Sequence, residues 1–124
     1  MKFHNNKPIY QQIGTVIRND IIKEKIKSGD RMPSIREMAI ELEVNPNTVN
    51  RAYADLQAEE IIFNKRGIGY FIHEKAKESI MEEEKKEFIE KKLPAIFDQM
   101  ILLNINFEDL QKYYDEYKAK GGKK

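Results

Sequence analysis

The chain has 124 residues, of which 40% are hydrophobic and 35% are charged, with 22 Lys and Arg against 21 Asp and Glu. This nearly balanced charge identifies no partner by itself, and the absence of cysteine excludes disulfides, thiolate zinc sites and a cysteine nucleophile. The longest apolar run is far shorter than the roughly 20 residues that span a bilayer. No apolar secretion signal follows Met1, so we expect a cytoplasmic protein that does not enter a membrane.

A first helix is predicted from Pro8 onward, because proline suits the first turn of a helix. Apolar residues then recur at three- and four-residue steps, which is typical of one buried helix face. They are Ile9, Ile13, Val16, Ile17, Ile21 and Ile26. Ser28-Gly29-Asp30 supplies a stop signal. The pattern therefore predicts a long amphipathic helix that reaches Ile26.

Two further helices follow, separated by a tight break. Ser34 and Glu37 form a capping-box pattern at the start of segment 35–42. The inner face of that short helix is predicted to consist of Met38, Ala39 and Leu42. Asn45-Pro46 then places a cap and a first-turn proline side by side, opening a helix that ends near Glu59. Its predicted buried stripe is Val49, Ala52, Tyr53 and Leu56.

Between residues 61 and 73 the pattern changes to two short apolar runs around a polar turn that contains glycine. Such a pattern predicts a β-hairpin. Helix, short helix, tight turn, helix and hairpin is the order of a winged helix-turn-helix, in which the third helix enters the DNA major groove and the hairpin is the wing. The predicted fold class is therefore mainly α with a small β-hairpin.

The side chains of these elements suit DNA recognition. Asn47 and Asn50, at outward positions of the third helix, offer the amide that pairs with adenine. Arg51 suits guanine or phosphate, and Thr48 suits phosphate or a thymine methyl. Lys65-Arg66-Gly67 brings two cations to a turn where the missing Cβ lets the backbone approach a groove. The complete predicted DNA-binding set is Ser34, Arg36, Asn45, Asn47, Thr48, Asn50, Arg51, Lys65, Arg66, Gly67 and Gly69.

Three motifs at matching mutual spacing resemble the GntR family of bacterial transcription regulators. They are Pro33 to Ala39, Val44 to Tyr53 and Lys65 to Phe71, with a further match from Ile9 to Ile13. The resemblance covers roughly residues 7 to 73. It implies DNA contacts by the following residues: Arg36, Asn47, Thr48, Asn50, Arg66 and the Gly67 backbone. Pro46 and Asn50 stand where some members have arginine, so the resemblance implies no particular operator.

The remaining residues are predicted to form a two-helix tail. The first half of its first helix is dense in charge, and we expect that half not to be buried. Pro94 predicts a kink in a helix that continues past it, and Asn106 caps the last helix. An apolar stripe begins at Phe88. The predicted interface residues are Phe88, Leu93, Ile96, Phe97, Met100, Leu103, Leu110 and Tyr114.

A tail of two helices resembles the YtrA-type subfamily, in which the tail is a dimerisation element and whose members commonly repress operons for membrane transporters. The predicted organisation is a DNA-binding domain over residues 1–73 and a helical dimerisation tail over residues 74–124. We therefore expect a repressor that binds a palindromic operator in double-stranded DNA as a homodimer. No pocket for a metabolite is expected within one chain, although Tyr113, Tyr114 and Tyr117 would offer aromatic surface between subunits.

Two other functional classes compete with this interpretation. A winged helix sometimes serves protein interaction or RNA binding without operator recognition, and the amides and Arg51 at the start of the third helix favour DNA over that alternative. An enzyme is not expected, because the sequence has no nucleophile elbow, phosphate loop or metal-ligand spacing. His4 and His73 lack partners for metal binding or catalysis, and Glu82 to Glu84 is expected to be a solvated face, so we predict no cofactor and no metal.

Overall fold

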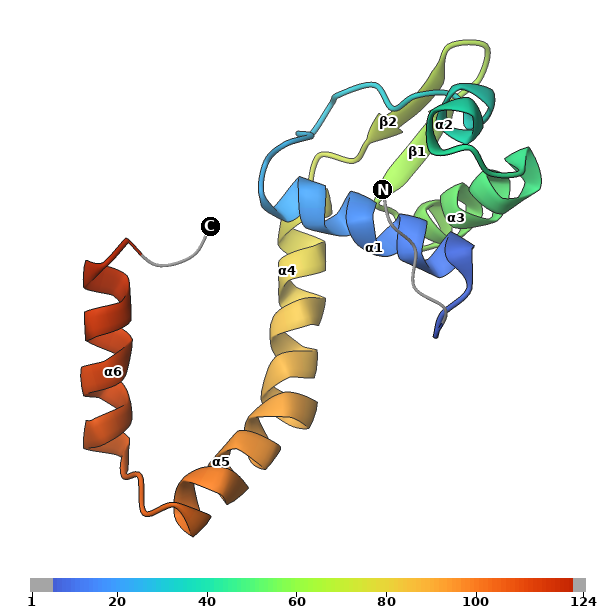
Figure 1. The fold of residues 1–124 in the computed structure, drawn as a ribbon. Helices are drawn as coiled ribbons and strands as arrows, with labels where there is room; N and C mark the ends of the chain where they lie inside the picture. The colour runs from blue at the N-terminus through green and yellow to red at the C-terminus, as the bar shows by residue number, and fades with distance from the viewer. Residues whose placement is uncertain (1–5, 122–124) are drawn as a thin grey trace. The chain divides into compact units, whose positions relative to one another are not determined.

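The computed structural model describes residues 6–121, which form helices and one hairpin in the predicted order (Figure 1). The elements are α1 (Ile9–Ile22), α2 (Ile35–Leu42), α3 (Pro46–Ala58), β1 (Ile62–Lys65), β2 (Gly69–Ile72), α4 (Ala76–Glu87), the π-helical turn η1 (Phe88–Lys92), α5 (Leu93–Leu102) and α6 (Phe107–Ala119). They divide into two compact units, of which the first ends at Glu83 and the second begins at Glu84. No helix within residues 6–121 is long and apolar enough to cross a membrane. His4 lies outside the described residues.

The core of the first unit joins α1, α2, α3 and the hairpin. The predicted stripe of α3 is confirmed, since Val49, Ala52, Tyr53 and Leu56 are all buried. Tyr53 fixes α3 in two ways. Its ring meets that of Tyr70 edge-on at 5.0 Å, and its hydroxyl donates a hydrogen bond of 2.7 Å to the carbonyl of Pro33. Burial raises the pKa of the Tyr53 hydroxyl. The start of the second helix and the middle of the third are therefore held together.

The first helix is shorter than its apolar pattern predicts, so the prediction that it reaches Ile26 was wrong. α1 ends at Ile22, because Glu24 adopts a left-handed backbone with φ of 61°. The N–H of Lys25 then donates to the carbonyl of Asp20 at 2.8 Å, which closes the helix end. Ile26 still packs against the core from outside the helix. Its apolar side chain therefore continued the helical spacing without belonging to the helix.

Both helices of the helix-turn-helix begin at the predicted caps. The Glu37 N–H donates to the Ser34 hydroxyl at 3.0 Å, and the Ser34 N–H donates to the Glu37 carboxylate at 2.8 Å. The bond from the Ser34 N–H lowers the pKa of Glu37, and the Ser34 hydroxyl adds to the effect, because hydrogen bonds donated to a carboxylate stabilise its ionised form. At α3, the Asn47 N–H donates to the Asn45 side chain at 2.8 Å, and Pro46 occupies the first turn. Local capping chemistry therefore sets where both helices start.

The hairpin is joined to the helices by a third line of backbone pairing. β1 and β2 are antiparallel, and the segment before α2 lies along the free side of β2. The Gly29 N–H donates to the Ile72 carbonyl at 2.9 Å, and the Ile72 N–H donates to the Asp30 carbonyl at 3.0 Å. The Met32 N–H donates to the Tyr70 carbonyl at 2.7 Å. The wing, which we define as β1, β2 and their turn, is therefore tied to the chain just before the helix-turn-helix.

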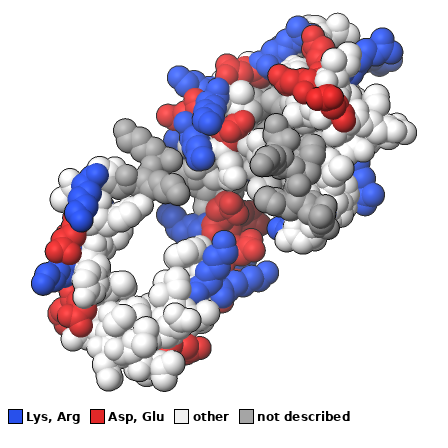
Figure 2. Space-filling view, viewed as in Figure 1, with Lys and Arg blue, Asp and Glu red and all other residues white. Residues whose placement is uncertain are grey.

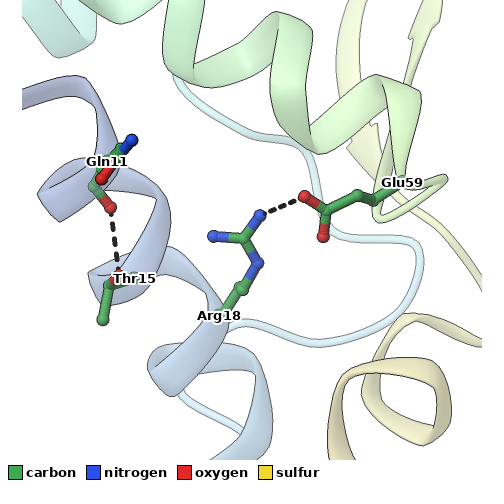
Figure 3. A network of polar contacts seen from close by, with 4 residues as sticks. All are labelled: Gln11, Thr15, Arg18 and Glu59. Atoms are coloured by element: carbon green, nitrogen blue, oxygen red, sulfur yellow. Dashed lines mark hydrogen bonds and ion pairs between the residues drawn. The ribbon is translucent and has the colours of Figure 1, made fainter. Parts of the chain in front are cut away.

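α1 and α3 also meet through polar side chains at the surface. The Arg18 guanidinium lies 2.7 Å from the carboxylate of Glu59, the C-cap residue of α3 (Figure 3). On the same helix, the Thr15 hydroxyl donates to the Gln11 carbonyl at 3.0 Å. The ion pair is partly exposed, so we expect it to contribute little free energy. It does mark one fixed point of contact between the two helices.

The first turns of α4 belong to the core of the first unit, which corrects the expectation that this charged half is not buried. Ala76 and Ile80 are 0% and 3% exposed. The Ser28 hydroxyl donates to the Glu74 carbonyl at 2.7 Å, and Lys77 pairs with Glu24 at 3.1 Å. Two apolar residues four positions apart are enough to bury one helix face, while the charged residues between them face solvent.

In the second unit, the end of α4 continues through η1 into α5. The helix passes Pro94 without a break, as predicted, and the distortion before the proline is a π-helical turn. There the Leu93 N–H donates to the Phe88 carbonyl, five residues back. Asn106 caps α6 as predicted, accepting a hydrogen bond from the Asp109 N–H at 2.8 Å.

Candidate nucleic-acid interface

The outward face of α3 presents amides and a guanidinium. Asn47 and Arg51 are four residues apart, so they share one face, and Asn50 lies beside them; all three are exposed. The side chains of Asn47 and Asn50 make no hydrogen bond within residues 6–121. The buried side of the same helix packs against α1 and the hairpin. The face is therefore presented on a helix that the core holds in place, with its amide groups available to base edges.

Three of the predicted residues lie at helix starts rather than on that face. Ser34 and Asn45 use their side-chain oxygens as caps, so they set where α2 and α3 begin. Thr48 is half-buried in the first turn of α3. Arg36, by contrast, is exposed on α2 and forms no ion pair within the described part of the chain. The neighbouring carboxylate of Glu37 is engaged by Ser34.

The turn of the wing is built for close approach of the backbone. The Ile68 N–H donates to the Lys65 carbonyl at 2.8 Å. Gly67 has φ of 79°, and, apart from Gly67 and its two chain neighbours, no described residue has an atom within 4 Å of the place where a Cβ would stand. Arg66 is exposed and unpaired within residues 6–121, whereas the Lys65 ammonium lies 5.3 Å from the centroid of the Phe71 ring. The turn thus offers one free cation, Arg66, and a second cation, Lys65, that contacts an aromatic ring of the hairpin.

Sequence reasoning missed two residues: Ile68 in the turn of the wing, and Arg31, which lies before α2 and contacts the wing. Arg31 forms an isolated bridge to Phe71, and its Nε would lie 3.1 Å from a Cβ at Gly69. Gly69 also has φ of 140°, so the position requires glycine. A single bridge is too short to produce an alternating pattern, which is why Arg31 gave no signal. Ile68 did give a signal, because hairpin turns favour polar residues and an isoleucine there is unusual. Its side chain is 55% exposed at the turn.

On the face shown in Figure 2, Lys and Arg are interspersed with Asp and Glu and form no single basic field. The whole chain has a formal net charge of only +1. A contact with DNA phosphates must therefore rely on individual cations at the right positions rather than on overall attraction.

The second unit exposes most of its apolar side chains. Of the predicted interface residues, Leu93, Met100 and Leu110 are half-buried, whereas Phe88, Ile96, Phe97, Leu103 and Tyr114 are exposed. No side chain of η1, α5 or α6 is buried. The sequence set also omitted exposed apolar and aromatic residues that lie off the predicted stripe: Ile89, Ile101, Leu102, Phe107, Tyr113 and Tyr117.

The π-helical turn changes which residues of the second unit share a face. In an α-helix the residue four positions on lies one turn above, whereas in a π turn it is the residue five positions on. Phe88 is therefore aligned with Leu93. From Leu93 the α-helical spacing continues the same face through Ile96, Phe97 and Met100. The result is one continuous apolar stripe.

Comparison with known proteins identifies the family. Residues 9–72 match the family described as bacterial regulatory proteins, gntR family. The chain belongs to the GntR family. The matched residues extend from α1 to β2 and contain all the predicted DNA-binding positions. This GntR protein is accordingly a transcription regulator with a winged helix-turn-helix DNA-binding domain, and it is not an enzyme.

The similarity extends into the tail. The HTH-type transcriptional repressor YtrA of Bacillus subtilis is 38% identical over 119 residues, covering 94% of this chain and 91% of YtrA. The uncharacterized regulator YhcF of the same organism is 38% identical over 109 residues, 88% of each chain. A GntR-family regulator from Bacteroides thetaiotaomicron superposes with a TM-score of 0.76 at 37% identity, covering 92% of this chain and 99% of its own. The resemblance to the YtrA type is thereby confirmed.

Proposed function

We propose that this GntR-family protein is a cytoplasmic repressor that binds a palindromic operator as a homodimer. The observation that carries the proposal is the exposed face of α3, which presents Asn47, Asn50 and Arg51. The opposite face of the same helix is buried in the core. The similarity to YtrA, which is named a repressor, supports the direction of regulation.

We assign the contacts by the chemistry of each side chain. The free amides of Asn47 and Asn50 read base edges in the major groove, because a carboxamide matches the donor and acceptor of adenine. Arg36 on α2 and Arg66 on the wing neutralise phosphates, since both are exposed and unpaired within residues 6–121. Ser34 and Asn45 act through the direction of the helices that they cap.

The exposed apolar side chains of the second unit support the dimer. Residues Phe88, Ile96 and Phe97 are 45%, 42% and 47% exposed in the single chain, on helices that have no buried residue of their own. Helices of this length gain most of their stability from packing an apolar face, and apolar patches of this kind mark interaction sites. A second copy of the chain has the same apolar stripe, so a two-fold contact buries the stripes of both copies. The proposed functional division lies at residue 73, where the hairpin has ended, whereas the compact unit that carries the hairpin continues to Glu83.

Selection of bound sites from random duplexes tests operator recognition. We expect a palindromic consensus with half-sites about one helical turn apart or a multiple of it. Anisotropy titrations then compare this duplex, a scrambled duplex, a single half-site and an RNA hairpin. Equal affinity for the selected and scrambled duplexes at physiological salt would overturn the proposal, and preferential RNA binding would favour the alternative winged-helix function.

Two substitutions separate base reading from phosphate contact. Asn50→Ala should weaken binding to the selected duplex by about 1–3 kcal/mol and relax specificity at one base pair of each half-site. Arg66→Ala should weaken binding to all duplexes alike and reduce the salt dependence by about one phosphate contact. Lys23→Ala, which removes one exposed cation at the far end of α1, is the charge-matched control and should leave both properties unchanged.

A further inference from the structure

We propose that Tyr10 is a positioning residue that holds Arg51 ready for a phosphate contact. The Arg51 guanidinium carbon lies 3.9 Å from the centroid of the Tyr10 ring, well inside the distance of about 6 Å at which cation–π attraction is felt. The two residues come from α1 and α3. The inference rests on the proposed role of the exposed α3 face in binding DNA.

The Tyr10 ring is itself fixed, so it can hold the guanidinium in one place. It is half-buried and packs against the core of the first unit. Its hydroxyl accepts a hydrogen bond of 3.2 Å from the Gln11 amide. Arg51 forms no ion pair with any described acidic residue. The aromatic ring is therefore the contact that determines where the Arg51 side chain lies.

Contact with the ring leaves the guanidinium able to bind an anion. The group has five N–H donors, and none of them forms a hydrogen bond or ion pair within residues 6–121, so they remain available. These donors lie on the same helix face as Asn47, four residues before Arg51. A side chain held in this way loses less conformational freedom when phosphate binds, and the binding is correspondingly tighter.

A second contact between α1 and α3 provides an internal control. Arg18 and Glu59 pair at 2.7 Å. Arg18 lies eight positions after Tyr10 in the sequence, and Glu59 lies eight positions after Arg51. Both contacts link the same two helices, yet only the first includes a residue of the exposed α3 face. Loss of the Arg18 pair should therefore affect helix packing without affecting the phosphate contact.

The test is a double-mutant cycle in the full-length protein, read by affinity for the selected duplex over a range of salt. Arg51→Ala should reduce the salt slope by about one phosphate contact. Tyr10→Ala should weaken binding about twofold to fivefold, whereas Tyr10→Phe, which keeps the ring, should bind as wild type. Tyr10→Ala should add nothing in the Arg51→Ala background. Arg18→Gln should leave the salt slope unchanged.

Each other result counts against the inference. Additive losses from Tyr10→Ala and Arg51→Ala would mean that Tyr10 supports the fold and not Arg51. A loss in Tyr10→Phe as large as in Tyr10→Ala would assign the effect to the hydroxyl. An unchanged salt slope in Arg51→Ala, with the wild type still discriminating the selected from the scrambled duplex, would overturn this inference alone. Loss of that discrimination in the wild type would instead overturn the proposed function.

Discussion

The hydroxyl of Tyr53 donates a 2.7 Å hydrogen bond to the carbonyl of Pro33, the residue immediately before the cap of α2. This bond joins α3, which carries the exposed amides, to the start of α2, which carries Arg36. A buried side chain of α3 therefore holds the start of α2 in place, because the Tyr53 ring belongs to the core.

Tyr53→Phe should destabilise the protein by about 1–3 kcal/mol, because it leaves the Pro33 carbonyl without its donor. Chemical denaturation followed by circular dichroism measures the change. Tyr70→Phe is the matched control, since Tyr70 keeps its edge-on ring contact and its hydroxyl makes no hydrogen bond within the described residues. A variant at position 53 as stable as the one at position 70 would contradict the prediction.

The capping box should make stability depend on pH in the acid range. Hydrogen bonds from Ser34 lower the pKa of Glu37 below its ordinary value of 4.5. The resulting contribution to stability is present above that value and is lost as the pH falls through the lowered pKa. Glu37→Gln should therefore be less stable than wild type at neutral pH, and the two proteins should converge as the pH falls below 4.5. Urea midpoints across this range, with Glu41→Gln as control, provide the measurement.

Gly69→Ala should distort the wing. The backbone φ of 140° is a conformation that alanine rarely adopts, and the new Cβ would stand 3.1 Å from Arg31 Nε. We expect a loss of about 1–3 kcal/mol in stability, and weaker operator binding. Gly67→Ala also meets a positive φ, of 79°, but it has open space around it, so it should cost less stability than Gly69→Ala. Equal unfolding free energies for the two variants would argue against a role for the Arg31 contact.

Phe97→Asp should abolish the dimer, because a carboxylate within an apolar interface is strongly destabilising. Sedimentation at tens of micromolar should then give a dimer for wild type and a monomer for the variant, which should bind a palindromic duplex no better than a single half-site. Ala95→Asp, exposed on the other side of α5, is the matched control. Monomeric wild-type protein under these conditions would refute the proposed assembly.

Sequence reasoning succeeded where a local interaction determines the structure. Ser34 and Asn45 could be recognised as caps because their partners lie two or three residues away. The stripe of α3 was visible because a buried helix face repeats at three- and four-residue steps. The motifs that resemble the GntR family then added the functional positions.

It failed where no local pattern marks the outcome, as at a left-handed residue or at a contact between residues distant in sequence. Nothing about Glu24 marks it as left-handed, so the end of α1 was placed too late. Arg31 reaches the wing through one bridge, and Tyr10 reaches Arg51 across 41 positions of the sequence. The burial of Ile80 depends on which surface the first turns of α4 meet, which the pattern of its own helix does not reveal.

The buried start of α4 has a practical consequence for building chimaeric regulators. A foreign oligomerisation element joined directly after the hairpin would remove Ala76 and Ile80, and it would leave holes against the hydrophobic core that they complete. Loss of a buried isoleucine typically costs about 2–5 kcal/mol, a large share of what holds a domain of this size together. A splice placed after Glu83, where the first compact unit ends, keeps Ala76 and Ile80 packed against the core. The foreign segment then determines the oligomeric state without destabilising the DNA-binding unit.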